Sequence, residues 1–252
     1  MTAISDVADA PDAPTGRALK LSRLPNGEPE IFTSIQGEGV SAGVPSVFVR
    51  LSLCNLACSF CDTKYTWQWT RYDPQQEIVR LEALEVIQRV DRTGIRNVVI
   101  TGGEPLLQQR ALAPLVAALK AGGKRIEIET NGTVLPNVAL AERVDQWNVS
   151  PKLANSGNDP ARREVAAALQ WFASQPHAGF KFVIAAPDDL EEVQSLVARY
   201  DVPAERVLLM PEGTDAATLN ERSRWLVERC CERGYRFTTR LHVLLWGDRR
   251  GR

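Results

Sequence analysis

Short apolar runs alternate along the chain with segments in which apolar residues recur every three or four positions. Runs that carry almost no polar residue are typical of parallel strands buried on both faces. The runs that we interpret as strands are residues 47–51, 97–101, 126–129, 147–150, 180–185, 206–210 and 237–245. The three-to-four spacing marks one face of a helix. It occurs at Leu112, Leu115, Val116 and Leu119, at Leu190, Val193, Leu196 and Val197, at Leu219, Leu226 and Cys230, and at Leu81, Leu84 and Ile87, with a further helix over residues 164–171.

This alternation predicts an α/β fold in which parallel strands are joined by helical crossovers. About six such units close most naturally into a partial (β/α) barrel. We expect a single domain over residues 28–252. Residues 1–27 are rich in Ala, Asp and Pro and are expected to form a disordered tail.

Composition narrows the choice of partner and compartment. The 252-residue chain has a formal net charge of −1 and no apolar run of membrane-spanning length, so we expect neither a nucleic-acid nor a membrane partner. The first 27 residues lack the apolar core of a secretory signal, which predicts a cytoplasmic location where thiols stay reduced. Five cysteines, an odd number, then favour metal binding or catalysis over a disulfide framework.

Polar and Gly-rich residues directly follow five of the predicted strands. In α/β barrels the active site lies at the carboxyl ends of the strands, so these positions are candidates for chemistry. They are Cys54, residues 102–104, residues 130–132, residues 151–152 and residues 211–213. A purely structural barrel does not require such turns at five of its strand ends.

Three cysteines in residues 54–61 are the strongest chemical signal. Cys54, Cys58 and Cys61 have the spacing C-x-x-x-C-x-x-C, which lets three thiolates converge on one metal centre. In a four-iron cluster, three protein ligands leave one iron open for an external ligand, whereas a fully ligated cluster mainly transfers electrons. A zinc site and a redox dithiol at Cys58 and Cys61 remain open as alternatives. Zinc lacks a nearby fourth ligand, and a dithiol leaves Cys54 without a role.

Two further segments carry groups suited to a charged small molecule. In residues 101–105 (TGGEP), two glycines permit close backbone approach to a ligand, and Glu104 can pair with an ammonium group; an ordinary strand-to-helix turn is the other interpretation. Gln36 and Glu38 lie in a Gly-flanked loop that suits a flat heterocycle with donors and acceptors. Arg50 lies inside a buried strand and therefore needs an anion, either a substrate carboxylate or a structural Glu.

The cysteine spacing, with Phe60 before the last cysteine, and the TGGEP segment resemble the signatures of the radical S-adenosylmethionine (radical SAM) superfamily. A closer resemblance, over residues 28–247, is to the 7-carboxy-7-deazaguanine synthase family of queuosine biosynthesis. It rests on the segments FTSIQGEGVSAGVPSVFVRLSLCNLACSFCDTKYTW, ITGGEPLLQ, ETNGT, VSPKL, FKFVI, LLMPEG and RLHVLLWG, which occur in this order.

The resemblance implies a radical SAM lyase that converts 6-carboxy-5,6,7,8-tetrahydropterin to 7-carboxy-7-deazaguanine and releases ammonia. It implies a [4Fe–4S] cluster on Cys54, Cys58 and Cys61, whose open iron binds S-adenosylmethionine. The resulting 5′-deoxyadenosyl radical would remove the hydrogen at C6 of the pterin. The resemblance also implies Mg²⁺, a flavodoxin-like protein or another reductant, and a homodimer.

Matching the family's motifs residue by residue assigns roles to three sets of residues. The substrate set is Ile35, Gln36, Gly37, Glu38, Arg50 and Thr101. The S-adenosylmethionine set is Phe60, Gly103, Glu104, Asn131, Ser150, Pro151, Lys152, Met210, Pro211, Glu212 and Gly213. Thr63 is assigned to Mg²⁺, for which a hydroxyl oxygen is a suitable hard ligand. His242 is expected in the last strand near the site, with a structural role equally open, and Cys230 and Cys231 are expected to be inert on a helix.

Two other functions share part of these signals. A different radical enzyme, such as a glycyl-radical activase, has the same cysteine spacing and a GGEP-like turn. It does not require S-x-Q-G-E-G together with the pair Cys61-x-Thr63. A non-catalytic zinc or iron–sulfur protein requires neither an open iron nor S-adenosylmethionine.

Overall fold

The computed structural model describes residues 18–252, and its described residues form one ten-stranded sheet. The strands are β1 (Leu19–Ser22), β2 (Ile31–Ile35), β3 (Pro45–Leu51), β4 (Ile78–Leu81), β5 (Asn97–Gly102), β6 (Arg125–Thr130), β7 (Gln146–Val149), β8 (Ala178–Ile184), β9 (Val207–Pro211) and β10 (Arg236–Phe237). Their order is β10-β9-β8-β7-β6-β5-β3-β1-β4, and β2 pairs with β3. From β3 to β10 along this order all pairs are parallel, whereas β1, β2 and β4 add antiparallel pairs at one end.

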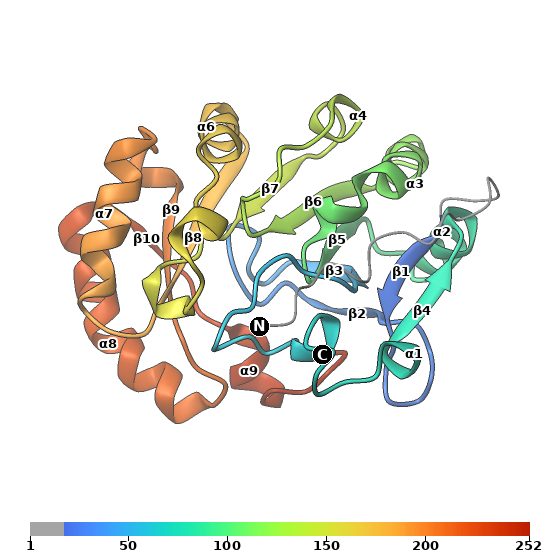
Figure 1. The fold of residues 1–252 in the computed structure, drawn as a ribbon, viewed down its shortest axis with the longest axis horizontal. Coiled ribbons are helices and arrows are strands. Elements are labelled where there is room, and N and C mark those ends of the chain that lie inside the picture. Colours follow the sequence, from blue (N-terminus) through green and yellow to red (C-terminus); the bar gives the residue numbers. More distant parts are fainter. Residues whose placement is uncertain (1–17) are drawn as a thin grey trace.

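Helices cover the outer side of the parallel strands, which curve into an open arc (Figure 1). The helices are α1 (Pro74–Glu77), α2 (Ala83–Asp91), α3 (Gln109–Ala121), α4 (Val138–Ala141), α5 (Pro160–Arg163), α6 (Ala166–Ser174), α7 (Asp189–Arg199), α8 (Ala216–Arg233) and α9 (Leu241–Trp246). Short 3₁₀ turns are η2 (Lys64–Thr66), η3 (Pro105–Gln108), η4 (Ala154–Ser156) and η5 (Ala204–Arg206). Within residues 18–252, none of the helices combines the length and the apolar character needed to cross a bilayer.

The predicted partial barrel is confirmed. Six of the seven apolar runs predicted as strands are β3, β5, β6, β7, β8 and β9, with ends that shift by no more than two residues. Continuous apolar runs were a reliable signal here because these strands have helices on one face and further packed residues on the other, so both faces are buried.

The seventh run, residues 237–245, was predicted wrongly. Only Arg236–Phe237 pairs with β9, and the chain then leaves the sheet and forms α9. Tertiary contacts override the apolar pattern here: the amide of Leu241 donates to the carbonyl of Gly37 at 2.9 Å, and Arg240 turns inward to Glu38. His242 therefore lies on a helix, not on a strand.

Two predictions near the amino-terminal half also need correction. The tail does not extend to residue 27, because Leu19 and Leu21 are fully buried in β1, which pairs with β4; residues 1–17 of the predicted tail lie outside the described residues. The stripe of Leu81, Leu84 and Ile87 does not form a buried helix face. Leu84 is 63% exposed, and the buried positions of α2 are Val86 and Val90.

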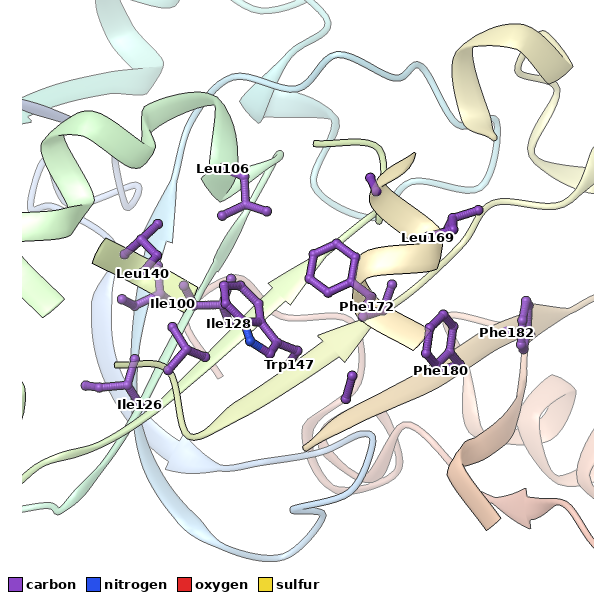
Figure 2. Packing of buried hydrophobic residues seen from close by; sticks show 14 of the residues in the cluster. Ile100, Leu106, Ile126, Ile128, Leu140, Trp147, Leu169, Phe172, Phe180 and Phe182 are labelled. Atoms are coloured by element: carbon purple, nitrogen blue, oxygen red, sulfur yellow. The ribbon is translucent and has the colours of Figure 1, made fainter. Parts of the chain in front are cut away.

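The core lies between the strands and the outer helices. Figure 2 shows the ring of Trp147 among apolar side chains of the neighbouring strands, with Phe172 from α6 beside it. Trp147 is fully buried, and its ring centroid lies 5.4 Å from that of Phe172 in an edge-on arrangement that aromatic rings favour. This dense layer fixes the strands, so the residues at their carboxyl ends have fixed positions relative to one another.

Two leucines on neighbouring helices test this assignment of the core. Leu115 in α3 is fully buried, whereas Leu84 in α2 is 63% exposed. We expect Leu115→Ala to lower the free energy of unfolding by about 2–5 kcal/mol through lost apolar contacts and the cavity left behind. Leu84→Ala should change it by less than about 0.5 kcal/mol. Urea unfolding of both variants measures the difference, and equal effects would contradict the assignment.

Candidate active site

One pocket lies at the carboxyl ends of the parallel strands and collects nearly all of the residues that the sequence singled out. The predicted residues that line it are Ile35, Gln36, Gly37, Glu38, Arg50, Cys54, Cys58, Phe60, Cys61, Thr63, Thr101, Gly103, Asn131, Ser150, Lys152, Met210, Glu212 and Gly213. Glu104, Pro151 and Pro211 do not line it. The convergence of residues spread over most of the chain on one pocket is what an active site at this end of a barrel requires.

The three cysteines of the loop face this pocket as free thiols. Among the described residues, no three His, Cys, Asp or Glu side chains are arranged to hold a single metal ion. Cys54, Cys58 and Cys61 all line the pocket and supply thiol donors, the ligand type that iron–sulfur clusters use.

The protonation of these thiols depends on their burial. Burial raises the pKa of Cys54 to about 12 and also raises the pKa of Cys61. Both are therefore protonated at neutral pH in the metal-free chain, and iron must displace the protons to bind the thiolates. The indole nitrogen of Trp67 donates to the sulfur of Cys61 at 3.3 Å, and a charged thiolate is a stronger acceptor of such a bond than a thiol.

Backbone contacts fix the cysteine loop against the TGGEP turn. Leu53 has a positive φ of 77°, and its carbonyl accepts from the amide of Glu104 at 2.7 Å. A Cβ atom at position 103 would lie 2.0 Å from that carbonyl oxygen, which is closer than any real contact, so only glycine fits. Gly102 adopts φ +132° beside Leu51 for the same reason. These two glycines allow the TGGEP turn to pack closely on the start of the cysteine loop, and both also line the pocket.

Glu104 does not have the position that the sequence predicted for it. Its carboxylate is fully buried behind the pocket and accepts from the amides of Leu106 (3.0 Å) and Asn131 (2.7 Å) and from the hydroxyl of Thr130 (2.9 Å). Burial raises its pKa, although these hydrogen bonds favour the charged form. Glu104 therefore positions Asn131, which lines the pocket, and has no exposed oxygen with which to contact an ammonium group.

A carboxylate that sequence analysis did not single out joins two predicted residues. The Glu129 side chain lines the pocket and accepts from the amide of Gln36 at 3.0 Å and from the hydroxyl of Thr101 at 2.6 Å. Acidic residues alternate with isoleucines in β6, Arg125–Thr130, and an acid inside a buried strand was the available signal. Gln36, Thr101 and Glu129 form a polar cluster with fixed donors and acceptors, which we call the Glu129 cluster.

A second cluster is built on Glu38 and contains two further cations that sequence analysis missed. Lys181 and Arg240 both form ion pairs with the Glu38 carboxylate, Arg240 through Nε at 3.0 Å. Burial disfavours the charged carboxylate, but the two cations outweigh it and hold the pKa of Glu38 well below its usual range. His242 Nε2 lies 3.9 Å from the same carboxylate, and burial lowers the pKa of this imidazole. A lysine inside the buried run of β8 was the signal for Lys181.

The sequence left two possible anions for Arg50, a substrate carboxylate or a structural Glu, and the structure shows the structural Glu. Its Nε donates to Glu30 at 2.9 Å, and Glu30 is fully buried. The guanidinium also lines the pocket, so the ion pair orients a cation towards a ligand. The hydroxyl of Thr63 lies 3.6 Å from the sulfur of Cys61 and borders the same pocket. A hydroxyl at this place is a suitable donor for Mg²⁺.

Comparison with known proteins agrees with this geometry. Residues 49–157 match the sequence profile of the Radical SAM superfamily. The chain is 40% identical over 227 residues to a 7-carboxy-7-deazaguanine synthase of Pyrobaculum aerophilum. The aligned region covers 88% of this chain and 96% of the relative. It is 39% identical to one of Halobacterium salinarum, over 87% of this chain and 90% of the relative.

A solved structure also superimposes on the chain over most of its length. The crystal structure of QueE from Escherichia coli matches with a TM-score of 0.68 at 26% identity, covering 89% of this chain and 95% of that one. On these similarities, the chain belongs to the 7-carboxy-7-deazaguanine synthase family of the radical SAM superfamily.

Proposed function

We propose that this chain is a radical SAM lyase that converts 6-carboxy-5,6,7,8-tetrahydropterin to 7-carboxy-7-deazaguanine with loss of ammonia, a step of queuosine biosynthesis. The observation that carries the proposal is the pocket at the carboxyl ends of the strands, which brings three free thiols together with the Glu129 and Glu38 clusters in a chain of this family. Family membership favours this lyase over the glycyl-radical activase and the non-catalytic metal-binding protein that the cysteine spacing alone left open.

The cysteines supply the ligands for the cofactors. A bound [4Fe–4S] cluster together with S-adenosylmethionine supplies a radical that abstracts a hydrogen atom from the substrate. Cys54, Cys58 and Cys61 would hold the cluster, and three protein ligands would leave one iron open to S-adenosylmethionine. The residues assigned to S-adenosylmethionine come from two strand ends that border the pocket. Ser150 and Lys152 follow β7, and the Lys152 amine donates to the Ser150 hydroxyl at 2.9 Å; Met210, Glu212 and Gly213 lie at the end of β9.

The two polar clusters and Arg50 are assigned to the substrate. The pterin is a flat heterocycle with an amide, an amino group and a carboxylate. Glu129 and Gln36 present acceptors and donors to the heterocycle. Their mutual hydrogen bond holds both side chains in one conformation before the substrate binds. Arg50, oriented by Glu30, is assigned to the substrate carboxylate, and Thr63 to a Mg²⁺ ion that this carboxylate shares.

A radical SAM enzyme also needs an electron donor. We propose a flavodoxin-like protein or an equivalent reductant, a cytoplasmic location that keeps the cysteines reduced, and a homodimeric assembly. The support is the family's chemistry and the thiol-based cluster site, since thiols of this kind persist in a reducing compartment.

Turnover by the reconstituted chain tests the function directly. After anaerobic reconstitution we expect about four irons per chain, and conversion of 6-carboxytetrahydropterin to 7-carboxy-7-deazaguanine in the presence of S-adenosylmethionine, Mg²⁺ and reductant. Cys58→Ala should lose both the cluster and the product. Cys231→Ala, at an exposed cysteine on α8, should retain both. Iron analysis and mass spectrometry of the product are the readouts.

A chain that binds four irons and cleaves S-adenosylmethionine, yet yields no deazaguanine, would contradict the substrate assignment and leave the superfamily chemistry intact. One tetrahedral zinc per chain without cleavage would contradict both.

The Glu129 cluster makes a separate prediction. Glu129→Gln keeps the shape of the side chain but removes the charge that accepts from Gln36 and Thr101. A hydrogen bond to a charged group contributes about 1.5–3 kcal/mol, so kcat/KM for the pterin should fall roughly tenfold to a hundredfold. Glu142→Gln, at a largely exposed side chain, is the matched control and should leave kcat/KM unchanged. Unchanged kinetics in Glu129→Gln would remove Glu129 from the substrate site.

A further inference from the structure

The crossover that follows β7 packs directly on the cysteine loop. The amide of Ala57 donates to the side-chain oxygen of Asn158 at 2.8 Å, and the amide of Ser59 donates to the carbonyl of Ser156 at 3.0 Å. These four residues lie about a hundred positions apart in the sequence, and the two bonds join the two segments on either side of Cys58. The crossover thus holds the cysteine loop through contacts separate from those of the TGGEP turn.

Asn158 also contacts a cysteine sulfur. Its side-chain nitrogen lies 3.2 Å from the sulfur of Cys58 and 3.1 Å from the hydroxyl of Ser156. The orientation of this amide is fixed by chemistry: the backbone N–H of Ala57 can only donate, so the atom facing it is the oxygen, and the NH₂ group faces the sulfur. A metal-bound thiolate is an acceptor only, so this contact becomes an N–H···S hydrogen bond to a charged sulfur.

We propose that Asn158 raises the reduction potential of the cluster by donating this hydrogen bond to the Cys58 sulfur. The inference rests on the proposed cluster and deepens it. Reduction adds one electron, and the extra negative charge is shared by the cluster and its thiolate ligands. A hydrogen bond to a ligand sulfur stabilises the more negative, reduced state more than the oxidised one, and hydrogen bonds to sulfur are among the factors that set such potentials.

A second donor lies on another of the three sulfurs. The indole N–H of Trp67 donates to Cys61 at 3.3 Å. The two donors come from separate segments and reach separate sulfurs. Trp67 therefore provides an independent comparison for Asn158 in the same cluster.

A purely structural role for Asn158 would rest on its bonds to Ala57 and Ser156, and the substitutions below separate that role from the contact with sulfur. Asn158→Asp retains the oxygen that accepts from Ala57 but replaces the N–H donor with a second oxygen. Asn158→Ala removes the side-chain contacts with Ala57, Cys58 and Ser156 without adding charge. Ser59→Ala is the matched control, because it removes a 3.2 Å hydroxyl bond to the carbonyl of Asn155, between the same two segments, and touches no sulfur.

The test is a redox titration of the reconstituted cluster, followed by electron paramagnetic resonance, with neither S-adenosylmethionine nor pterin present. We expect Asn158→Ala and Trp67→Phe each to disfavour reduction about tenfold, a lowering of ~59 mV for a one-electron couple. Asn158→Asp should lower the potential at least as far, because its charge opposes the added electron. Ser59→Ala should have the same reduction potential as the wild type.

Three results would overturn the inference. They are an unchanged potential in Asn158→Ala, a shift in Asn158→Asp only, which would be an effect of charge alone, and a shift in Ser59→Ala equal to that in Asn158→Ala. Failure of the wild-type chain to assemble a four-iron cluster would instead contradict the proposed function. If Asn158→Asp does not hold the cluster, Asn158→Ala and Trp67→Phe still decide the question.

Discussion

The active site depends on the contact between the carbonyl of Leu53 and the glycine pair that ends β5. Only glycine at position 103 can approach this oxygen, and the amide of Glu104 completes the contact with a 2.7 Å hydrogen bond. This contact sets where the cysteine loop begins, and therefore which way its three sulfurs face. Glu104, held by three hydrogen bonds of its own, links the same turn to Asn131 after β6. Two neighbouring strand ends and the cysteine loop thus behave as one rigid unit on which cofactor and substrate are oriented.

The parallel sheet then brings the substrate residues to a common level. Arg50 on β3 pairs in register with Thr101 on β5, and Thr101 bonds to Glu129 on β6. Charged side chains at this depth are costly unless they are paired. Glu30 balances Arg50, and Lys181 and Arg240 balance Glu38. The pocket can therefore present several full charges to a small polar ligand while the outer face of the same strands remains an apolar core.

Much of the fold and part of the site followed from the sequence, for identifiable physical reasons. Continuous apolar runs marked six buried parallel strands, and cysteine spacing marked the cluster loop, because both signals are local. Lys181, Arg240 and Glu129 escaped notice because each is a single charged residue whose partner is distant in sequence. Glu104 was seen, but its burial behind the turn depends on Thr130 and Asn131, which spacing does not reveal. For the same reason the sequence predicted a strand where the chain forms α9: its contact with Gly37 joins residues far apart in the sequence.

The central claim is that Cys54, Cys58 and Cys61 leave one iron of a cluster open to S-adenosylmethionine. Electron–nuclear double resonance on the reduced cluster tests it directly, with S-adenosylmethionine isotopically labelled in its amino or its carboxylate group. The account predicts that both labels couple magnetically to the cluster, because both groups are bound to the open iron. A reduced four-iron cluster that shows no coupling to either label would contradict it.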